Sequence, residues 1–148
     1  MFEIIKLDLK VIEDIEKILS TNKFMDYSKD TCTVKGFQTD NIINIFSTNL
    51  LKQMLPYLDF SERVFHIHYI NYYNEGYQKK HNHAETEKFS FILYLNDADG
   101  DTVFEDPIKK NIKPQKGILI LFDSSIWHYG KMTSNNKRVL VGAIDKCF

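Results

Sequence analysis

The segment RVFHIHYINYY, residues 63–73, has the pattern of a β-strand. Its β-branched and aromatic residues alternate on a two-residue period, which places Val64, His66 and His68 on one face and Phe65, Ile67 and Tyr69 on the other. Segments of the same kind follow along the chain: FSFILYLN (89–96), DTVFED (101–106), GILILF (117–122) and RVLVGAI (138–144). Short strands separated by Gly, Asn, Asp and Pro residues predict an antiparallel barrel or sandwich.

The residues before this β-rich part predict two amphipathic helices. Residues 10–19 carry apolar side chains at helical spacing, with acidic residues between them. A second apolar pattern runs from Ile42 to Met54, where Asp40 is the expected N-cap and Pro56 the expected stop. We therefore expect a single domain over residues 1–148, with residues 1–62 as a mixed, partly helical support.

The bulk composition excludes several classes of protein. A chain of 148 residues with 43% hydrophobic residues is long enough for one compact core. Nineteen basic against twenty acidic residues give no electrostatic reason to expect a nucleic acid or an anionic membrane as partner. Charges interrupt the apolar residues of the N-terminus, so we expect no signal peptide and no membrane span, and a cytoplasmic protein. Cys32 and Cys147 lie too far apart in sequence to suggest a disulfide framework or a cysteine zinc site.

Two histidines one residue apart, His81 and His83, stand just ahead of the strand at 89–96. On a strand, side chains two residues apart share a face with Cα atoms roughly 6.6 Å apart, so both imidazoles could reach one ion. His128 is the other histidine of the second half and the candidate for a third ligand. Imidazole suits iron, zinc, copper and nickel alike. The alternative is that His81, which follows two lysines, belongs to a solvated polar loop.

A second pair of this kind, His66 and His68, lies on the preceding predicted strand. We interpret these two as hydrogen-bonded strand residues, one of which is a candidate for supporting a metal ligand from outside the coordination sphere.

Several motifs occur in an order that resembles a known family. The motifs are YNEGYQKKHNH (73–83), YLN (94–96), GDTVF (100–104), KPQKGILILF (113–122), WH (127–128) and Arg138. In this order they resemble the iron(II)- and 2-oxoglutarate-dependent oxygenases, most closely the small prolyl-4-hydroxylase-like members and the HxH-containing relatives met in phage genomes. The similarity covers residues 63–146, and GFQTDN (36–41) adds a weaker likeness. A viral origin would move the expected location to the cytoplasm of the host cell.

The resemblance implies a mainly β fold with N-terminal helices, in which residues 63–146 form a double-stranded β-helix, a jelly-roll or cupin-like barrel. It implies that His81 and His128 are metal ligands and that Arg138 grips the far carboxylate of 2-oxoglutarate, since a guanidinium can pair with a carboxylate through two hydrogen bonds. Tyr94 matches a tyrosine that bonds the same carboxylate, and Tyr73 matches one that lines the cosubstrate pocket. The alternatives are that Arg138 is a charged residue at the edge of the barrel and that Tyr94 is an aromatic residue packed on a strand.

The sequence departs from the family at position 83. The usual iron site has two histidines and one carboxylate, with HxD or HxE as the first pair, but His83 stands where the carboxylate is expected. Three interpretations follow: His83 is itself a ligand, Glu85 supplies the carboxylate, or the site is degenerate. We favour His83, because the spacing from Gly76 to His81 matches the family and leaves position 83 facing inward.

The resemblance also implies a reaction. It implies that Fe(II), 2-oxoglutarate and O₂ take part in an oxidative decarboxylation coupled to hydroxylation of a substrate, either a small molecule or a peptide. A first alternative is a cupin-like dioxygenase with three histidine ligands that does without 2-oxoglutarate, in which Arg138 holds the substrate. A second is a catalytically silent jelly-roll module with a binding or structural role. The identity of the substrate and the oligomeric state are not predicted.

Overall fold

The computed structural model describes residues 1–56, 62–83 and 88–146. In this part of the chain the strands form one nine-stranded sheet with the order β1-β7-β4-β9-β3-β8-β5-β6, and β2 pairs with β3 beside this path. The strands are β1 (Phe2–Lys6), β2 (Thr33–Gln38), β3 (Glu62–His81), β4 (Phe89–Tyr94), β5 (Thr102–Asp106), β6 (Lys110–Ile112), β7 (Ile118–Asp123), β8 (Trp127–Gly130) and β9 (Lys137–Lys146). The helices are α1 (Leu9–Thr21) and α2 (Thr48–Met54), with short 3₁₀ turns η1 (Ser28–Asp30) and η2 (Ile43–Ile45).

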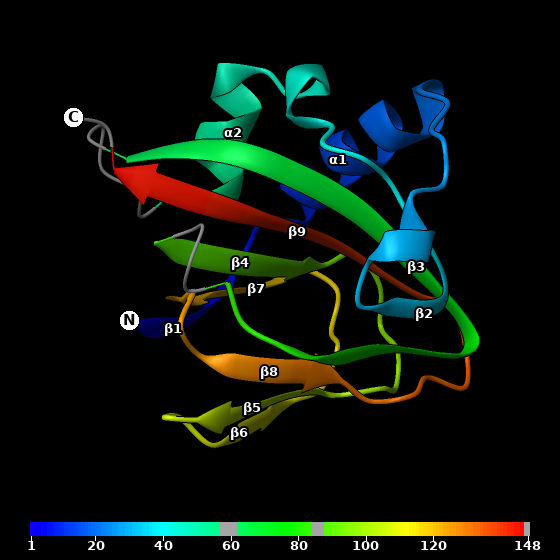
Figure 1. The fold of residues 1–148 in the computed structure, drawn as a ribbon. Coiled ribbons are helices and arrows are strands. Elements are labelled where there is room, and N and C mark those ends of the chain that lie inside the picture. The colour runs from blue at the N-terminus through cyan, green and yellow to red at the C-terminus, as the bar shows by residue number, and fades with distance from the viewer. Residues whose placement is uncertain (57–61, 84–87, 147–148) are drawn as a thin grey trace.

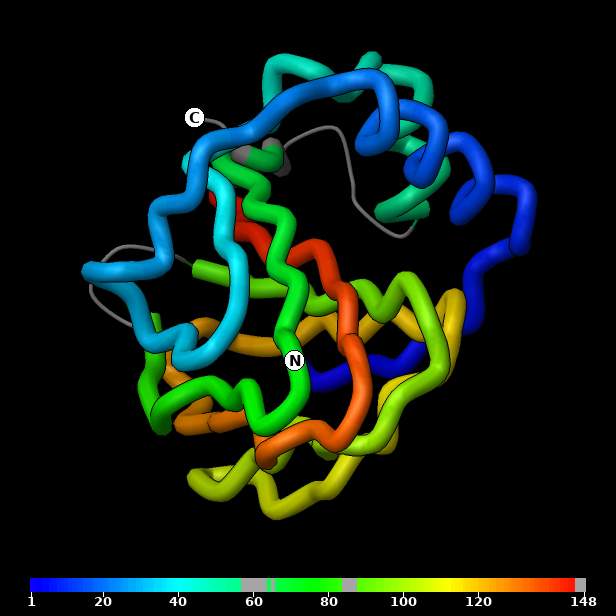
Figure 2. Tube along the Cα trace, turned by 90° about the vertical axis from the view of Figure 1, so that its right-hand side faces the viewer, coloured from blue at the N-terminus to red at the C-terminus, as the bar shows by residue number. Residues whose placement is uncertain are grey.

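The sheet is curled, so that β8, β5 and β6 lie opposite the layer that contains β3 and β9 (Figure 1). Both helices cover the outer side of the β3 and β9 layer, and the view from the side shows them over the same end of the molecule (Figures 1 and 2). All the paired strands are antiparallel. The structure confirms the prediction of a mainly β jelly-roll fold with N-terminal helices. Neither helix of the described residues is long and apolar enough to cross a membrane.

The long strand β3 belongs to both layers because it bends near its middle (Figure 1). Its first part pairs with β9, and its last part pairs with β8. At the bend Glu75 has a φ of 69°, and a Cβ on Gly76 would lie 2.4 Å from the carbonyl oxygen of Lys35. No other residue type fits at position 76 without a backbone shift. One strand therefore supplies side chains to both walls of the barrel.

Two apolar cores lie on opposite sides of the β3 and β9 layer. The outer core joins the helices to the sheet, with Ile12 and Ile15 of α1 packed in the same cluster as Leu140 of β9. The inner core fills the barrel and includes Tyr72 and Val139. Because successive strand residues point to opposite faces, odd-numbered and even-numbered residues of β9 serve different cores.

The structure corrects two local expectations. The second predicted helix is split into η2 and the shorter α2, and its N-cap is Ser47, whose Oγ accepts a hydrogen bond from the Leu50 amide at 3.1 Å, instead of Asp40. Val64 does not share a face with His66, because the register with β9 shifts between these two residues and Val64 packs against the outer core. The bulge turns His66 and His68 toward the interior of the barrel.

Candidate metal centre

Three histidines meet at one end of the barrel. His81 ends β3, His83 follows two residues later, and His128 of β8 is the cross-strand partner of His81. Their candidate ligand atoms all lie within 4.8 Å of one another. The ring centroids are 4.3 Å apart for His81 and His128, 4.7 Å for His81 and His83, and 5.8 Å for His83 and His128. Three imidazoles on facing strands at this spacing can hold one transition-metal ion.

Backbone carbonyls orient two of these rings. Nδ1 of His81 lies 2.7 Å from the carbonyl oxygen of Lys79, and Nδ1 of His128 lies 3.0 Å from that of Ile126. A carbonyl oxygen only accepts hydrogen bonds, so each Nδ1 carries the proton and donates it. In the neutral ring Nε2 then carries the lone pair, and this is the tautomer that metal-binding histidines with such a partner have.

The third ring is positioned through its backbone. The amide of His83 donates to the carbonyl oxygen of Ser124 at 2.8 Å. The side chain of Ser124 is itself buried and forms a 2.8 Å hydrogen bond with the hydroxyl of Ser90 on β4. The segment after β3 is thus tied to the β7–β8 turn, which keeps position 83 next to His128.

The environment of His128 keeps its ring neutral. Its side chain is 2% exposed, and the rings of Phe104 and Phe122 lie 5.6 and 4.9 Å away. Burial, together with the nearby His81 and His83, lowers the pKa of His128 to about 3. A neutral imidazole is the form that binds metal ions, so the donor set fits a metal without first losing a proton at His128.

Among the described residues, the group able to hold a metal consists of these three histidines. Glu85, the alternative source of a carboxylate, lies outside the described residues.

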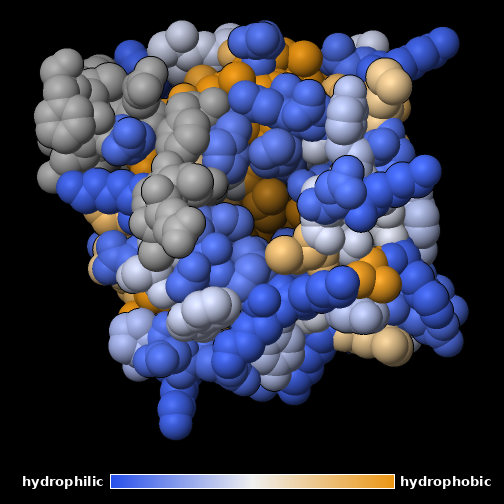
Figure 3. Space-filling view, in the orientation of Figure 1, coloured by the Kyte–Doolittle hydropathy of each residue, from blue (hydrophilic) through white to orange (hydrophobic). Residues whose placement is uncertain are grey.

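A pocket of about 360 Å³ opens next to the three histidines. The two further histidines of the chain, His66 and His68, line it as well, so all five histidines face one cavity. Its walls otherwise combine apolar and small polar side chains: Thr31, Cys32, Gln38, Ile70, Gln78, Ser90, Phe91, Ile92, Phe122 and Val141, with Gly142. The face drawn in Figure 3 is mostly hydrophilic, but it is hollowed near its middle, with apolar atoms at the base of the hollow.

A buried amine lies at the other end of the barrel interior. Lys137 of β9 is 4% exposed, and its Nζ donates to the carbonyl oxygen of Gly100 at 2.7 Å. Nζ also lies 5.1 Å from the ring centroid of Tyr72, its cross-strand partner on β3. Burial lowers the pKa of Lys137 to about 8, although Asp101 and Asp99 act in the opposite direction.

A small cavity beside this amine shares part of its lining with the histidine pocket. It is lined by Lys137, Tyr72 and Thr102, and it shares Gln78, Ile92 and Val141 with the larger pocket. Thr102 also accepts a 2.6 Å hydrogen bond from the hydroxyl of the buried Tyr94.

No protein-family model and no curated protein matches the sequence. Solved structures do match. A 2OG-Fe(II) oxygenase family oxidoreductase from Burkholderia pseudomallei aligns with a TM-score of 0.73 and 11% identity over 97% of this chain and 85% of its own. The viral collagen prolyl hydroxylase of Paramecium Bursaria Chlorella virus-1, solved with 2OG, aligns with a TM-score of 0.65 and 15% identity over 97% and 94%. HygX from Streptomyces hygroscopicus, with nickel, 2-oxoglutarate and hygromycin B bound, aligns with a TM-score of 0.70 and 9% identity over 99% and 83%.

The chain has the fold of the 2OG-Fe(II) oxygenases. The match extends over nearly the whole chain, so the N-terminal helices are part of the shared architecture as well as the barrel.

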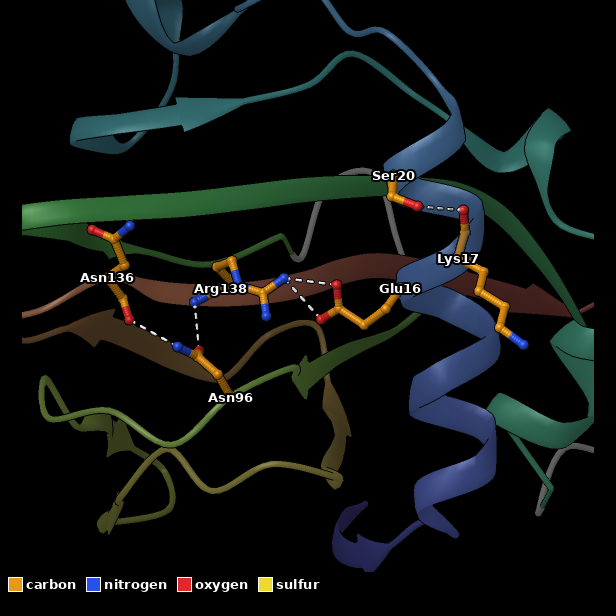
Figure 4. A network of polar contacts seen from close by, with 6 residues as sticks. All are labelled: Glu16, Lys17, Ser20, Asn96, Asn136 and Arg138. Carbon is orange, nitrogen blue, oxygen red and sulfur yellow. Dashed lines mark hydrogen bonds and ion pairs between the residues drawn. The ribbon is translucent and has the colours of Figure 1, made fainter.

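Within this oxygenase fold, Arg138 lies on the face of β9 opposite the pocket. Its Nη1 lies 2.8 Å from both carboxylate oxygens of Glu16 on α1, and its backbone amide donates to the side chain of Asn96 (Figure 4). This corrects the expected position of Arg138 at the cosubstrate pocket. The physical reason is the alternation of the strand, because the neighbouring Lys137 takes the inward position.

The two tyrosines expected at the pocket are also placed. Tyr73 is 46% exposed, whereas its neighbour Tyr72 is buried and faces the barrel interior beside Lys137. Tyr94 points into the inner core, where it bonds Thr102. Tyr94 thus contacts Thr102, which lines the small cavity, whereas Tyr73 lies on the surface.

Sequence reasoning missed Lys137, Tyr72, Thr102 and Gln78 as pocket residues. The signal that the sequence offered was the two-residue alternation of a strand. His68, Ile70 and Tyr72 follow His66 on the same face of β3, and Lys137, the antiparallel partner of Tyr72, lies on that side as well. That inference requires the register of β3 with β9, which the spacing of motifs does not provide.

Proposed function

We propose that this protein is an Fe(II)- and 2-oxoglutarate-dependent oxygenase that hydroxylates a small-molecule or peptidyl substrate. The observation that supports it most is the pairing of two groups in one barrel with the oxygenase fold: a three-imidazole cluster at one end and a buried amine at the other. These are the two kinds of group that a metal-chelating dicarboxylate requires.

In this proposal His81, His83 and His128 hold the metal, the first and third through Nε2. Bound Fe(II) and 2-oxoglutarate would supply the oxidising chemistry for the hydroxylation. Three neutral imidazoles leave the full double positive charge of the ion uncompensated by the protein, in contrast to a site with a carboxylate ligand. The site therefore favours a dianionic cosubstrate electrostatically.

Lys137 is the group that we expect to bind the far carboxylate. Its ammonium is shielded from water, and a carboxylate that replaces the Gly100 carbonyl as its partner gives a charge-assisted hydrogen bond. The hydroxyl of Thr102, held by Tyr94, lines the same small cavity and can donate a second hydrogen bond. The apolar side chains of Ile92 and Val139 keep water from this end of the cavity.

The experiment is an anaerobic titration. Fe(II) and then 2-oxoglutarate are added to the apo-protein, and the visible charge-transfer absorption of the chelate is recorded for wild type, His83→Ala, Lys137→Met and Arg138→Ala. We expect the absorption in wild type, its loss in His83→Ala, a much weaker titration in Lys137→Met, and wild-type behaviour in Arg138→Ala. Absence of the absorption in wild type, with no succinate formed when O₂ is admitted, would contradict the proposal.

A second candidate function arises from the same cluster, because three histidines without a carboxylate also suit a dioxygenase that binds its substrate directly to the metal. In that case the protein consumes O₂ with a substrate and without 2-oxoglutarate. Measuring O₂ consumption with and without 2-oxoglutarate separates the two reactions.

A further inference from the structure

The pair His66 and His68 is not used by the cosubstrate in the proposed function. Along β3 the inward-facing residues run from His66 and His68 through Ile70 to Tyr72, which lies at the amine end. At about 3.3 Å per residue, His68 and His66 lie ~13 and ~20 Å along the strand from Tyr72. The five-carbon chain of 2-oxoglutarate spans only roughly 5–7 Å. The part of the pocket next to the histidine pair is therefore left for another ligand.

The hydrogen bond of His68 determines what this part of the pocket can bind. Nδ1 of His68 lies 3.0 Å from the carbonyl oxygen of Thr39, so Nδ1 must carry the proton. Burial lowers the pKa of His68 and favours the neutral ring. His66 reinforces this effect, whereas the hydrogen bonds to the backbone of Thr39 and Asp40 and the charge of Asp40 oppose it. The remaining nitrogen, Nε2, then has a lone pair and no proton. It accepts a hydrogen bond and cannot donate one.

The other lining residues narrow the choice of ligand. The described residues that line this pocket include no Asp, Glu, Lys or Arg. A charged substrate group would lose its hydration there without gaining a counter-ion, which is unfavourable, whereas a neutral donor needs only an acceptor. The whole pocket has a volume of about 360 Å³, at the lower end for small-molecule sites, and the metal and cosubstrate of the proposed function would take part of it, so the remainder suits a small compound or a single side chain.

We propose that His68, with His66 beside it, forms the substrate subsite, and that Nε2 of His68 accepts a hydrogen bond from a neutral donor on the substrate, a hydroxyl or an amide N–H. This assignment rests on the proposed function for its placement of the cosubstrate. The ring of His66 lies 4.9 Å from that of His68 and forms the adjoining wall. The amide of Gln38 and the hydroxyl of Thr31 line the same pocket and supply further polar contacts.

The test is ¹⁵N NMR of the full chain loaded with Zn²⁺ and 2-oxoglutarate. The imidazole nitrogen shifts of His68 first report which nitrogen is protonated. The probes are two matched pairs: myo-inositol with its hexa-O-methyl ether, and N-methylacetamide with N,N-dimethylacetamide. In each pair only the first member has a hydrogen-bond donor. Ethanolamine serves as a cationic comparison.

We expect His68 to be protonated at Nδ1. The two donor-bearing probes should produce a saturable change in the chemical shift of His68 Nε2. The methylated partners and ethanolamine should not produce this change. His68→Phe should weaken binding of these probes roughly three- to tenfold, the effect of losing one neutral hydrogen bond, and His68→Gln should recover part of it. Tyr69→Phe, which alters the neighbouring residue on the outer face of β3, is the matched control and should leave binding unchanged. An Nε2–H form, equal binding of methylated probes, or no shift with either donor-bearing probe would overturn the proposal.

The same variants separate this inference from the proposed function. His68→Phe should retain the Fe(II)–2-oxoglutarate absorption of the wild type. If wild type lacks that absorption, the proposed function fails, while the NMR titration, repeated on the protein with Zn²⁺ alone, still decides whether His68 accepts a donor. If the absorption is normal and the NMR titration negative, the subsite alone is wrong.

Discussion

Lys137 and Arg138 are adjacent cations on β9, and their side chains lie on opposite sides of the sheet. Lys137 enters the barrel, where it bonds the Gly100 carbonyl, while Arg138 pairs with Glu16 on α1. Tyr72 and Tyr73 divide in the same way on β3. Tyr72 and Lys137 are cross-strand partners, so the inward-facing residue of each strand is the neighbour of the one implied by the resemblance, Tyr73 on β3 and Arg138 on β9. On a strand, one residue changes the face.

The first prediction concerns these two cations. If Lys137 binds the far carboxylate as proposed, Lys137→Met removes a charge-assisted hydrogen bond worth roughly 1.5–3 kcal/mol and should raise the Kd for 2-oxoglutarate by about ten- to a hundredfold. Arg138→Ala removes a group that faces α1 and should change that Kd by less than about twofold. Anaerobic titration of the Fe(II) protein measures both. The reverse order of effects would return the cosubstrate role to Arg138.

The second prediction follows from the lowered pKa of Lys137, about 8 in the free protein. Below this pH the amine is protonated and can pair with a carboxylate, and above it a growing fraction must first take up a proton. Affinity for 2-oxoglutarate should therefore be level below pH 8 and fall as the pH rises further. Titrations from pH 6 to 10 test this, with Lys137→Arg as a comparison that should stay level. A flat wild-type profile up to pH 10 would contradict the assignment.

At the scale of the secondary-structure elements, the parts of the fold with a strong repeating pattern were predictable. Helix α1 and the strands β4 and β7 are apolar at the expected spacing, and the structure contains them close to the expected bounds. β2 and β6 lack such a pattern, because β2 is mostly half-buried and β6 mostly exposed, and both are short strands stabilised by pairing with a neighbouring strand more than by their own sequence. The residues of these two strands do not by themselves indicate with which strand they pair.

The same distinction applies to the site. His81, His83 and His128 were grouped from their spacing, and the structure places them within 4.8 Å. The sequence does not show which of Lys137 and Arg138 faces the barrel interior. The residues that follow them on β9 are apolar on both faces, so they do not alternate between polar and apolar. The choice depends on which side of the sheet α1 covers.

The third prediction concerns the close contact between β9 and its neighbours. A Cβ on Gly142 would lie 2.4 Å from the His66 carbonyl oxygen and 2.5 Å from a ring carbon of Phe91, so Gly142→Ala must displace backbone. We expect a loss of roughly 1–3 kcal/mol in the free energy of unfolding, as for other overpacked cores. Gly130→Ala is the matched control, because its nearest contacts are at 3.4 Å. Urea denaturation of both variants gives the comparison, and equal stability would contradict it.

At the scale of the whole molecule, the buried His128 makes the apo-protein sensitive to acid. Its folded-state pKa of about 3 lies below the unfolded value of 6.5, so the unfolded chain binds the extra proton first. Stability of the metal-free protein should therefore fall as the pH decreases from about 6.5 toward 3. Thermal unfolding of the apo-protein across this range measures the effect, and His128→Phe should show a shallower decline. A decline of equal steepness in His128→Phe would assign the acid sensitivity to other groups.

Metal binding should stabilise the folded state, because the three histidines converge only there. With free Ni²⁺ or Zn²⁺ at a hundred times its Kd, the expected gain is about 2.7 kcal/mol. For a domain of this size that corresponds to a rise in Tm of roughly 5–10 °C. The rise should disappear in His81→Ala and remain in the His66→Phe variant. A rise that depends on His66 instead would place the metal at the other histidine pair.

Between its pairing with β9 and its pairing with β8, β3 bends at Glu75 and Gly76, and the opposite chain forms the loop between β8 and β9. Hydrogen bonds link this bend to this loop. The amide of Glu75 donates to the Thr133 carbonyl at 2.7 Å, and the amide of Thr133 donates to the Gly76 carbonyl at 3.0 Å. The chain from Tyr72 to His81 contains as many residues as the chain from His128 to Lys137, and the two are paired at both ends. A deletion in one segment would force a mismatch at one end, whereas equal deletions in both would keep both pairings and bring the two ends of the pocket closer together. Coordinated length changes in the two segments can therefore alter the distance between the imidazole cluster and the buried amine. If these two groups hold the ends of a diacid as proposed, such changes would adapt the barrel to a shorter or longer one.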